Sequence, residues 1–197
     1  MVLNNLWVTI PTGKRRDYLE DIITSSGVPK EQIVIVHTDE SKPIDGVNNL
    51  WDFDKINIHR WWNRGIKYAK DNGAKYIAVL NDDIEIRDDA LQKIVAAMDE
   101  TNAVLAYPYP FEGWVCGYCW VLRLDTDIIA DEKYRWWYGD RDIDLQAKQK
   151  GLVIGVACKV RHIHGNELTR DNPKLMELTK IDEKYFFDKW KDVVKRS

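Results

Sequence analysis

The sequence predicts an α/β fold, with a mixed, mostly parallel β-sheet flanked by helices. Three short runs, at 6–10, 33–36 and 76–80, are apolar and rich in β-forming residues, which is typical of strands buried on both faces. Apolar residues at helical spacing lie between these runs, and the order strand–helix–strand implies parallel strands joined by right-handed crossovers. The length of 197 residues is that of a single domain.

The first unit of this fold is a βαβ arrangement. Its first strand is predicted over Leu6–Ile10, and its second over Ile33–Val36. Between them, four apolar residues recur at helical spacing, namely Tyr18, Leu19, Ile22 and Ile23. Gly27 then ends the predicted helix, because glycine readily adopts the left-handed conformation found after helix ends.

A polar stretch and a long helix come next. Residues 41–54 include Pro43 and Gly46 and are predicted to form a loop. The helix is predicted over about Ile58–Asn72 and contains Gly65. Because a glycine inside a helix costs about 1 kcal/mol relative to alanine, Gly65 indicates close packing or the close approach of a ligand.

The chain changes in character after a further amphipathic helix near residues 91–98. Strands are predicted at 104–107, 118–124 and 153–158, with aromatic loops at 107–114 and 134–140. A helix is predicted over about 141–150, and Asn172 with Pro173 provides a good start for a helical tail. We therefore expect two halves, about 1–100 and 101–170, and a tail at 171–197.

Composition excludes several classes of protein. The net charge of −3 and the pI near 5.8 give no overall basic surface for nucleic acid. The three cysteines are odd in number and no secretory signal accompanies them, so we expect reduced thiols and a cytoplasmic location. No apolar run approaches the length of a membrane span.

An acidic group follows the strand Tyr76–Leu80. This strand ends in Asn81, Asp82 and Asp83, at the kind of sheet edge where open α/β sheets bind ligands. The chain has neither GxGxxG after its first strand nor GxxxxGK[ST], so phosphate charge must be met in another way. A divalent cation on Asp82 or Asp83 fits this need. The alternative is a turn followed by a helix cap.

Two further clusters could carry chemistry. Asp140, Asp142 and Asp144 lie at a predicted helix start, where the helix dipole favours ionised carboxylates. One of them could act as a general base, or all could serve only to cap the helix. His162 and His164 are two residues apart, so in an extended chain both imidazoles would face one site, as metal ligands or as ordinary side chains.

Taken together, these segments resemble the inverting GT-A glycosyltransferases, close to the family-2 type. The resemblance rests on five segments in matching order: VTIPT (8–12), VHTD (36–39), NRGIKYAKDNGAKYIAVLNDDIEI (63–86), WYGDRDIDLQAKQKG (137–151) and VRHIHGN (160–166). It implies a nucleotide-sugar donor, with a UDP-sugar as the leading expectation, and Mn²⁺ or Mg²⁺ as the metal.

The resemblance also implies roles for individual residues. The metal ligands would be Asp83 and either His162 or His164, with His162 fitting the spacing slightly better. Asp142 matches the position of the catalytic base, and Asp140 is a rival because Arg141 stands where the family usually carries an acid. The donor would contact residues at the strand ends and on the long helix, namely Pro11, Thr12, Asp39, Asn63, Arg64 and Asp82.

The acceptor is expected on the aromatic side. Five aromatic residues are placed to form a platform for a sugar or acceptor, although about half should instead be core: Trp114, Tyr118, Trp120, Trp136 and Trp137. The acceptor hydroxyl could belong to a glycan, a small molecule or a modified base in nucleic acid. No QxxRW motif is present, which disfavours a processive polysaccharide synthase.

Two other functions remain open from the sequence. A nucleotidyltransferase would carry a basic, glycine-rich loop after the first strand, and GKRR at 13–16 is a faint version of one. A non-catalytic carbohydrate-binding protein would need the aromatic residues but not the acidic clusters.

Overall fold

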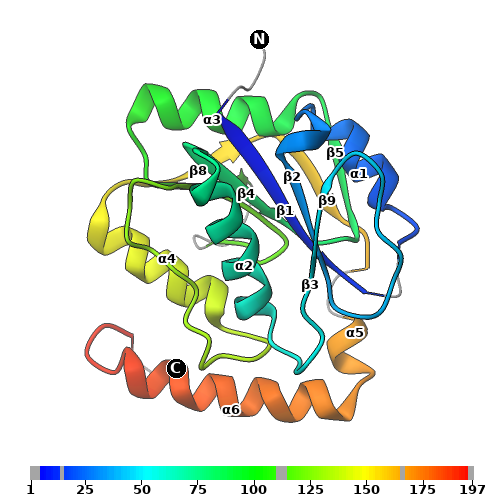
Figure 1. Cartoon of the computed structure of the whole chain (residues 1–197). Helices are drawn as coiled ribbons and strands as arrows, with labels where there is room; N and C mark the ends of the chain where they lie inside the picture. The colour runs from blue at the N-terminus through cyan, green and yellow to red at the C-terminus, as the bar shows by residue number, and fades with distance from the viewer. Residues whose placement is uncertain (1–4, 14–15, 110–114, 165–166, 195–197) are drawn as a thin grey trace.

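The computed structural model describes residues 5–13, 16–109, 115–164 and 167–194, which form a sheet covered by helices (Figure 1). The seven-stranded sheet has the order β3-β2-β1-β4-β7-β6-β8. In this sheet β7 pairs antiparallel with both β4 and β6, and the four other strand pairs are parallel. The predicted mixed, mostly parallel sheet is therefore confirmed. The strands are β1 Leu6–Thr12, β2 Ile33–His37, β3 Asn48–Trp51, β4 Tyr76–Leu80, β6 Leu105–Tyr109, β7 Cys119–Arg123 and β8 Val153–Ala157.

A second, two-stranded sheet lies beside the first. It pairs β5 (Ile84–Arg87) with β9 (Lys159–His162) in antiparallel register, with Ile84 opposite His162. Because β5 follows directly after the acidic residues that end β4, this pairing carries the 160s segment to the end of β4.

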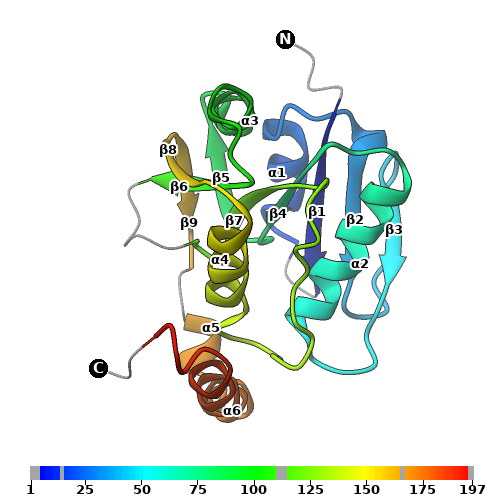
Figure 2. The same cartoon turned by 90° about the vertical axis from the view of Figure 1, so that its left-hand side faces the viewer.

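The helices cover the sheet and one end of the molecule. Their bounds are α1 Leu19–Ser25, the short 3₁₀ helix η1 Lys30–Gln32, α2 Ile58–Asp71, α3 Ala90–Thr101, α4 Gly139–Lys150, α5 Glu167–Arg170 and α6 Pro173–Lys189. Both views place α6, coloured orange to red, beneath α4 (Figures 1 and 2). No helix in the described residues has the length and apolar character needed to cross a lipid bilayer.

The edge strand β3 corrects the prediction of a loop over 41–54. Asn48–Trp51 pairs with β2 in parallel, with Asn48 opposite Val34. The strand has no apolar run, and polar side chains hold it instead. The Asn48 amide donates to the backbone oxygens of Glu31 at 2.8 Å and of Ile33 at 3.2 Å. Hydropathy alone cannot detect a strand of this kind.

The glycine inside α2 is explained by packing. A Cβ atom at Gly65 would overlap the side chain of Thr9 on β1. The structure therefore confirms close packing as the reason for this glycine.

Replacing Gly65 by alanine should destabilise the protein. Overpacking costs typically about 1–3 kcal/mol, and this overlap is severe, so the cost should exceed the roughly 1 kcal/mol that alanine gains in helix propensity. Urea unfolding of Gly65→Ala should show a lower free energy of unfolding, whereas Lys67→Ala on the exposed face of α2 should change it by less than about 0.5 kcal/mol. A more stable Gly65→Ala protein would contradict the packing account.

The sheet topology brings the polar strand ends together. β1, β2, β3 and β4 all end at one edge, and β7 begins there, since Leu80 pairs with Cys119. The Asn81 N–H extends this pairing by donating to the Tyr118 oxygen at 2.9 Å. This edge is where the candidate site residues meet.

Candidate active site

The acidic residues that follow β4 contact both neighbouring segments. Asp82 accepts a hydrogen bond from Thr12 Oγ1 at 2.8 Å, which joins it to the end of β1. Asp83 is buried, and its Oδ1 lies 3.0 Å from Nε2 of His162 on β9. The structure thus brings four predicted site residues into one cluster.

Burial disfavours negative charge in this cluster. It raises the pKa of Asp82 to about 6, and the neighbouring carboxylate of Asp83 acts in the same direction. The hydrogen bond from Thr12 opposes the shift. A bound cation would offset the same unfavourable charge.

The donor set fits a divalent metal that shares its ligands with a substrate. A carboxylate oxygen of Asp83 and an imidazole nitrogen of His162 face each other, and within the described residues no group of three or more His, Cys, Asp or Glu side chains could hold an ion. Mg²⁺ and similar cations commonly use one or two protein ligands together with substrate phosphates. Asp83 and His162 would hold such an ion.

The two histidines have different surroundings. The ring of His162 stacks on Tyr118, with centroids 5.0 Å apart and planes inclined by 20°. His164 instead lies against Tyr18, with centroids 5.7 Å apart. Of the pair, His162 is therefore the one that contacts Asp83.

Asp142 does not reach this edge. It is fully buried, and it accepts hydrogen bonds from Trp190 Nε1 at 2.7 Å and Gln146 Nε2 at 2.6 Å. Lys189 Nζ lies 2.7 Å from the same carboxylate. These surroundings do not fit the predicted role of Asp142 as the general base, because a carboxylate enclosed by α6 cannot meet an acceptor.

Asp140 is connected to this edge through the segment before β7. A Cβ atom at Gly117 would lie 2.9 Å from Asp140 Oδ2, and Gly117 directly precedes Tyr118, which stacks on His162. Burial raises the pKa of Asp140, and hydrogen bonds from backbone N–H groups partly oppose this. Asp144, the third acid, is buried with Lys148 Nζ 2.6 Å from its carboxylate.

The residues predicted to hold the nucleotide separate into two groups. Pro11 and Thr12 are buried at the end of β1, and Asp39 lies nearby, since a Cβ atom at Gly13 would be 4.0 Å from its Oδ2. Asp39 Oδ1 also accepts a hydrogen bond from the N–H of Ser41 at 3.0 Å. These residues remain candidates for contacts with a base or ribose.

Asn63 and Arg64 on α2 are engaged elsewhere. The Asn63 amide exchanges hydrogen bonds with the backbone of Ala130, at 2.8 and 3.0 Å, and also donates to Glu132. Arg64 lies 3.4 Å from Asp52, which also pairs with Arg60. The prediction of a donor contact for Asn63 is therefore not supported, because both atoms of its amide group bind the 130s loop.

Most of the aromatic residues predicted to form an acceptor platform either pack in the core or are held by hydrogen bonds in a loop. Trp120 is fully buried and packs edge-to-face on Trp62, so its prediction as an acceptor residue is wrong. Trp136 and Trp137 are half-buried, and both indole N–H groups donate to Thr169 Oγ1, at 2.8 and 3.2 Å. Trp114 lies outside the described residues.

Sequence reasoning missed a buried histidine at the same edge. His37 ends β2, with Arg16 Nη2 2.7 Å from its Nδ1 and Asn49 Oδ1 2.7 Å from its Nε2. Because arginine can only donate, Nδ1 accepts and Nε2 donates, which is the neutral tautomer. Burial lowers the pKa of His37 in agreement with this. The sequence signals were a polar residue directly after an apolar strand and the place of His37 in the segment VHTD (36–39).

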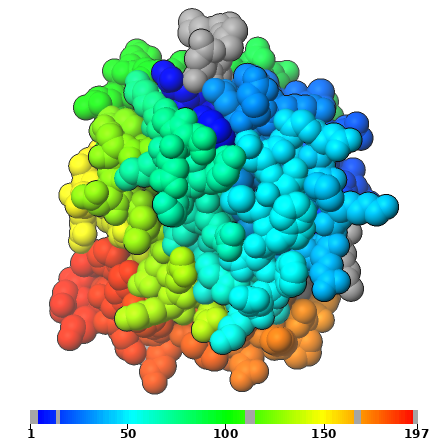
Figure 3. Space-filling view, in the orientation of Figure 1, coloured from blue at the N-terminus to red at the C-terminus, as the bar shows by residue number. Residues whose placement is uncertain are grey.

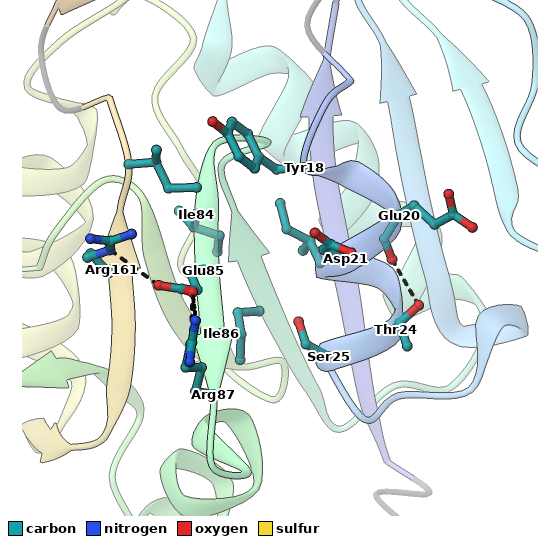
Figure 4. A pocket seen from close by; sticks show the side chains of 12 residues that line it. Tyr18, Glu20, Asp21, Thr24, Ser25, Ile84, Glu85, Ile86, Arg87 and Arg161 are labelled. Carbon is teal, nitrogen blue, oxygen red and sulfur yellow. Dashed lines mark hydrogen bonds and ion pairs between the residues drawn. The ribbon is translucent and has the colours of Figure 1, made fainter.

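A cavity of about 600 Å³ lies between α1 and β5 (Figure 4). Its floor includes Ile84 and Ile86, and its rim carries the ion pair of Glu85 with Arg161 at 3.2 Å. Asp82, Asp83, Asp140 and His162 are not among its lining residues.

The mixed sheet, with acidic residues at the end of its central strand and a histidine beside them, defines the chain as a GT-A type α/β protein. Residues 57–160, more than half of the chain, match the family described as Glycosyl transferase family 2, so the chain belongs to this family.

Solved structures support the fold. TarS from S. aureus superposes with a TM-score of 0.61 at 14% identity, covering 90% of this chain and 39% of that one. TarS 1–349 in complex with UDP gives 0.61 at 14%, covering 90% and 65%. GalNAc-T7 with UDP, GalNAc and Mn²⁺ gives 0.63 at 12%, covering 81% and 44%. The chain thus spans 39–65% of the length of these structures. Among curated proteins, no sequence match is found.

Proposed function

We propose that this chain transfers a sugar from a nucleotide sugar to an acceptor hydroxyl, with metal dependence and inversion at the anomeric carbon. The observation that carries the proposal is the contact of Asp83 with His162 at 3.0 Å, across 79 residues of sequence. Asp140 lies against Gly117, which directly precedes Tyr118, the residue stacked on His162. Two similar structures contain UDP and one of them Mn²⁺, which supports a UDP-sugar as donor and Mn²⁺ or Mg²⁺ as metal.

Each residue has a distinct part in this reaction. Asp140 accepts the proton of the acceptor hydroxyl while that oxygen attacks the anomeric carbon from the face opposite the nucleotide. The bond from this carbon to the diphosphate breaks, and its electron pair leaves with the diphosphate. A metal ion held by Asp83 and His162 would offset the charge on that leaving group. The stacked Tyr118 fixes the orientation of the His162 ring.

Donor and acceptor would approach from different sides of this edge. Asp39, Pro11 and Thr12 would meet the base and ribose, and Asp82 would lie near the ribose or the metal. The acceptor would approach Asp140 from the side of the Trp136–Trp137 turn. Its hydroxyl could belong to a glycan, a small molecule or a modified base in nucleic acid.

The products of the reaction test the proposal against a nucleotidyltransferase. Incubation with Mn²⁺ and a panel of UDP-glucose, UDP-GalNAc and GDP-mannose should release a nucleoside diphosphate from one donor, by transfer to water or to an added acceptor. In a parallel incubation with UTP and glucose 1-phosphate, release of pyrophosphate would instead indicate nucleotidyl transfer. Arg16, the last residue of the GKRR segment, binds His37 and the Lys42 oxygen and gives no support to that alternative.

The same assay addresses a carbohydrate-binding protein without catalysis. Such a protein would leave every nucleotide sugar intact. Chelation with EDTA should abolish release of the nucleoside diphosphate, and addition of excess Mn²⁺ should restore it. Release that is unaffected by EDTA would contradict metal dependence.

A further inference from the structure

We propose that Asp182 of α6 is a positioning residue, which sets the place of Asp140 by organising the turn Arg135–Tyr138. The catalytic part of this proposal rests on the proposed function. The structural part, that Asp182 orders this turn, stands on the contacts below.

Asp182 is a fully buried carboxylate with an unusual set of donors. Three successive backbone N–H groups point at it, those of Arg135 at 3.0 and 3.1 Å, Trp136 at 2.7 Å and Trp137 at 2.9 Å. Successive N–H groups that converge in this way form an anion-binding concavity, and here the anion is supplied by the protein itself. The carboxylate therefore dictates the backbone conformation of the turn.

The other side of the turn is fixed by α2. The Ile58 N–H donates to the Arg135 oxygen at 3.0 Å, and the Asn57 amide donates to the Glu132 oxygen at 2.9 Å. Gly139 packs so tightly on His59 that a Cβ atom would overlap the imidazole. With α2 on one side and Asp182 on the other, the turn has little freedom to shift.

The turn leads directly into the helix that carries Asp140. Tyr138 adopts a left-handed conformation with φ of 66°, and α4 begins at the next residue. A left-handed tyrosine is unfavourable without support from its surroundings. Because Asp140 is the second residue of α4, any change in this turn moves its carboxylate relative to Asp83 and His162.

A second contact, at the end of α6, fixes the first turn of α4. Trp190 and Lys189 bind the buried carboxylate of Asp142, two helical turns beyond Asp182 on α6. Residues 182, 186 and 190 follow at intervals of four, so they lie along one face of the helix. The α6 segment thus holds the turn before α4 through Asp182 and the first turn of α4 through Asp142.

The positioning helix lies outside the segment that matches the family. That segment ends at residue 160, whereas α6 spans Pro173–Lys189. On the surface, residues of the orange and red segments form a band along one end of the molecule, next to the yellow-green segment (Figure 3). Asp182 therefore adds to the family's segment a residue that controls the acceptor side.

Three variants of α6 test the proposal: Asp182→Ala, Asp182→Asn and Asp188→Asn. Alanine removes the acceptor of all three N–H groups, whereas asparagine keeps one oxygen. Asp188 lies on the exposed face of the same helix and is the matched control. The measurements are the Kd of UDP with Mn²⁺ by calorimetry, the kcat and KM for hydrolysis of the best UDP-sugar per binding-competent protein, and hydrogen exchange of residues 134–141.

We expect exchange of the turn to increase in both Asp182 variants and kcat to fall by about 10²-fold in Asp182→Ala, since small displacements near reacting groups cost about that much. Asp182→Asn should lie between this variant and the wild type. The Kd of UDP and the KM for donor should stay within twofold, and Asp188→Asn should match the wild type. An unfolded fraction would also lower the apparent kcat without changing KM, and expressing kcat per binding-competent protein removes that effect.

Other results would overturn the proposal. Unchanged exchange at 134–141 would show that Asp182 does not order the turn, and wild-type kcat with increased exchange would show that the turn does not position Asp140. If Asp182→Ala fails to fold, Asp182→Asn decides both points. If the wild type itself releases no nucleoside diphosphate, the proposed function fails, whereas the exchange measurement still decides whether Asp182 orders the turn.

Discussion

Replacing Asp140 by asparagine should abolish most sugar transfer while leaving the protein folded. The change keeps the size and most hydrogen bonds of the side chain but removes its ability to accept a proton, and loss of a general base typically costs about 10²–10⁴-fold in rate. Calorimetry should show unchanged affinity for UDP with Mn²⁺, because the base acts on the acceptor. The rate of release of the nucleoside diphosphate measures the catalytic effect.

Asp142→Asn is the matched control for this experiment. Its buried carboxylate accepts hydrogen bonds from Trp190 and Gln146 and pairs with Lys189, and a hydrogen bond to a charged group contributes about 1.5–3 kcal/mol. Thermal unfolding should therefore show a much lower melting temperature, with turnover retained well below it. A stable, inactive Asp142→Asn protein beside an active Asp140→Asn protein would return the role of base to Asp142.

Replacing Asp83 by alanine should remove the part of UDP binding that depends on metal. Loss of one of two protein ligands should weaken the affinity for UDP with Mn²⁺ by about 100-fold or more, since even outer-shell partners of metal ligands contribute 10–100-fold. His162→Ala should have an effect of the same kind. Titration calorimetry with and without EDTA measures it.

Asp39→Ala provides the contrast for the metal variants. Asp39 lies near the end of β1, away from the contact of Asp83 with His162, and it is expected to hydrogen-bond the uracil imide. Its loss should weaken UDP binding equally with and without metal. Identical behaviour of the Asp39 and Asp83 variants would contradict their separate roles.

The sequence predicted the parts of the fold that bury continuous apolar runs. Strands β1, β2 and β4 are such runs, and their order specified the parallel part of the sheet. The strand β3 escaped detection because Asn48 and Asn49 stabilise it through side-chain hydrogen bonds rather than burial. The local sequence pattern of a segment does not show which strand it will pair with.

The sequence predicted which segments contribute to the candidate site. It did not predict which side chain of each segment faces the site. Asp140 and Asp142 are two residues apart, so on a helix they project about 200° from each other, to opposite sides. Only the packing of α6 against α4 shows that the side carrying Asp142 is covered. Trp120 was misassigned for the same reason, since a tryptophan in the core and one on a binding surface look alike in sequence.

One signal for Asp182 was present in the sequence. Phe186, Trp190 and Val194 predicted an apolar face of the last helix, and Asp182 continues that face one turn earlier. A carboxylate in an apolar stripe must find donors or a cation when it is buried. The identity of those donors depends on a segment 47 residues away, which no local pattern reveals.

The turn Arg135–Tyr138 is held between α2 and Asp182 of α6, and these contacts also affect the order in which the protein folds. Arg135 and Asp182 are 47 residues apart in the sequence. The N–H groups of the turn therefore have no carboxylate to bind until α6 has been synthesised. At roughly 5–20 residues per second, this leaves a delay of a few seconds after the turn has been synthesised. The nucleotide side of the sheet, built from β1, β2 and β4, can form during that time. We therefore expect a nascent chain to bind UDP before it can carry out transfer.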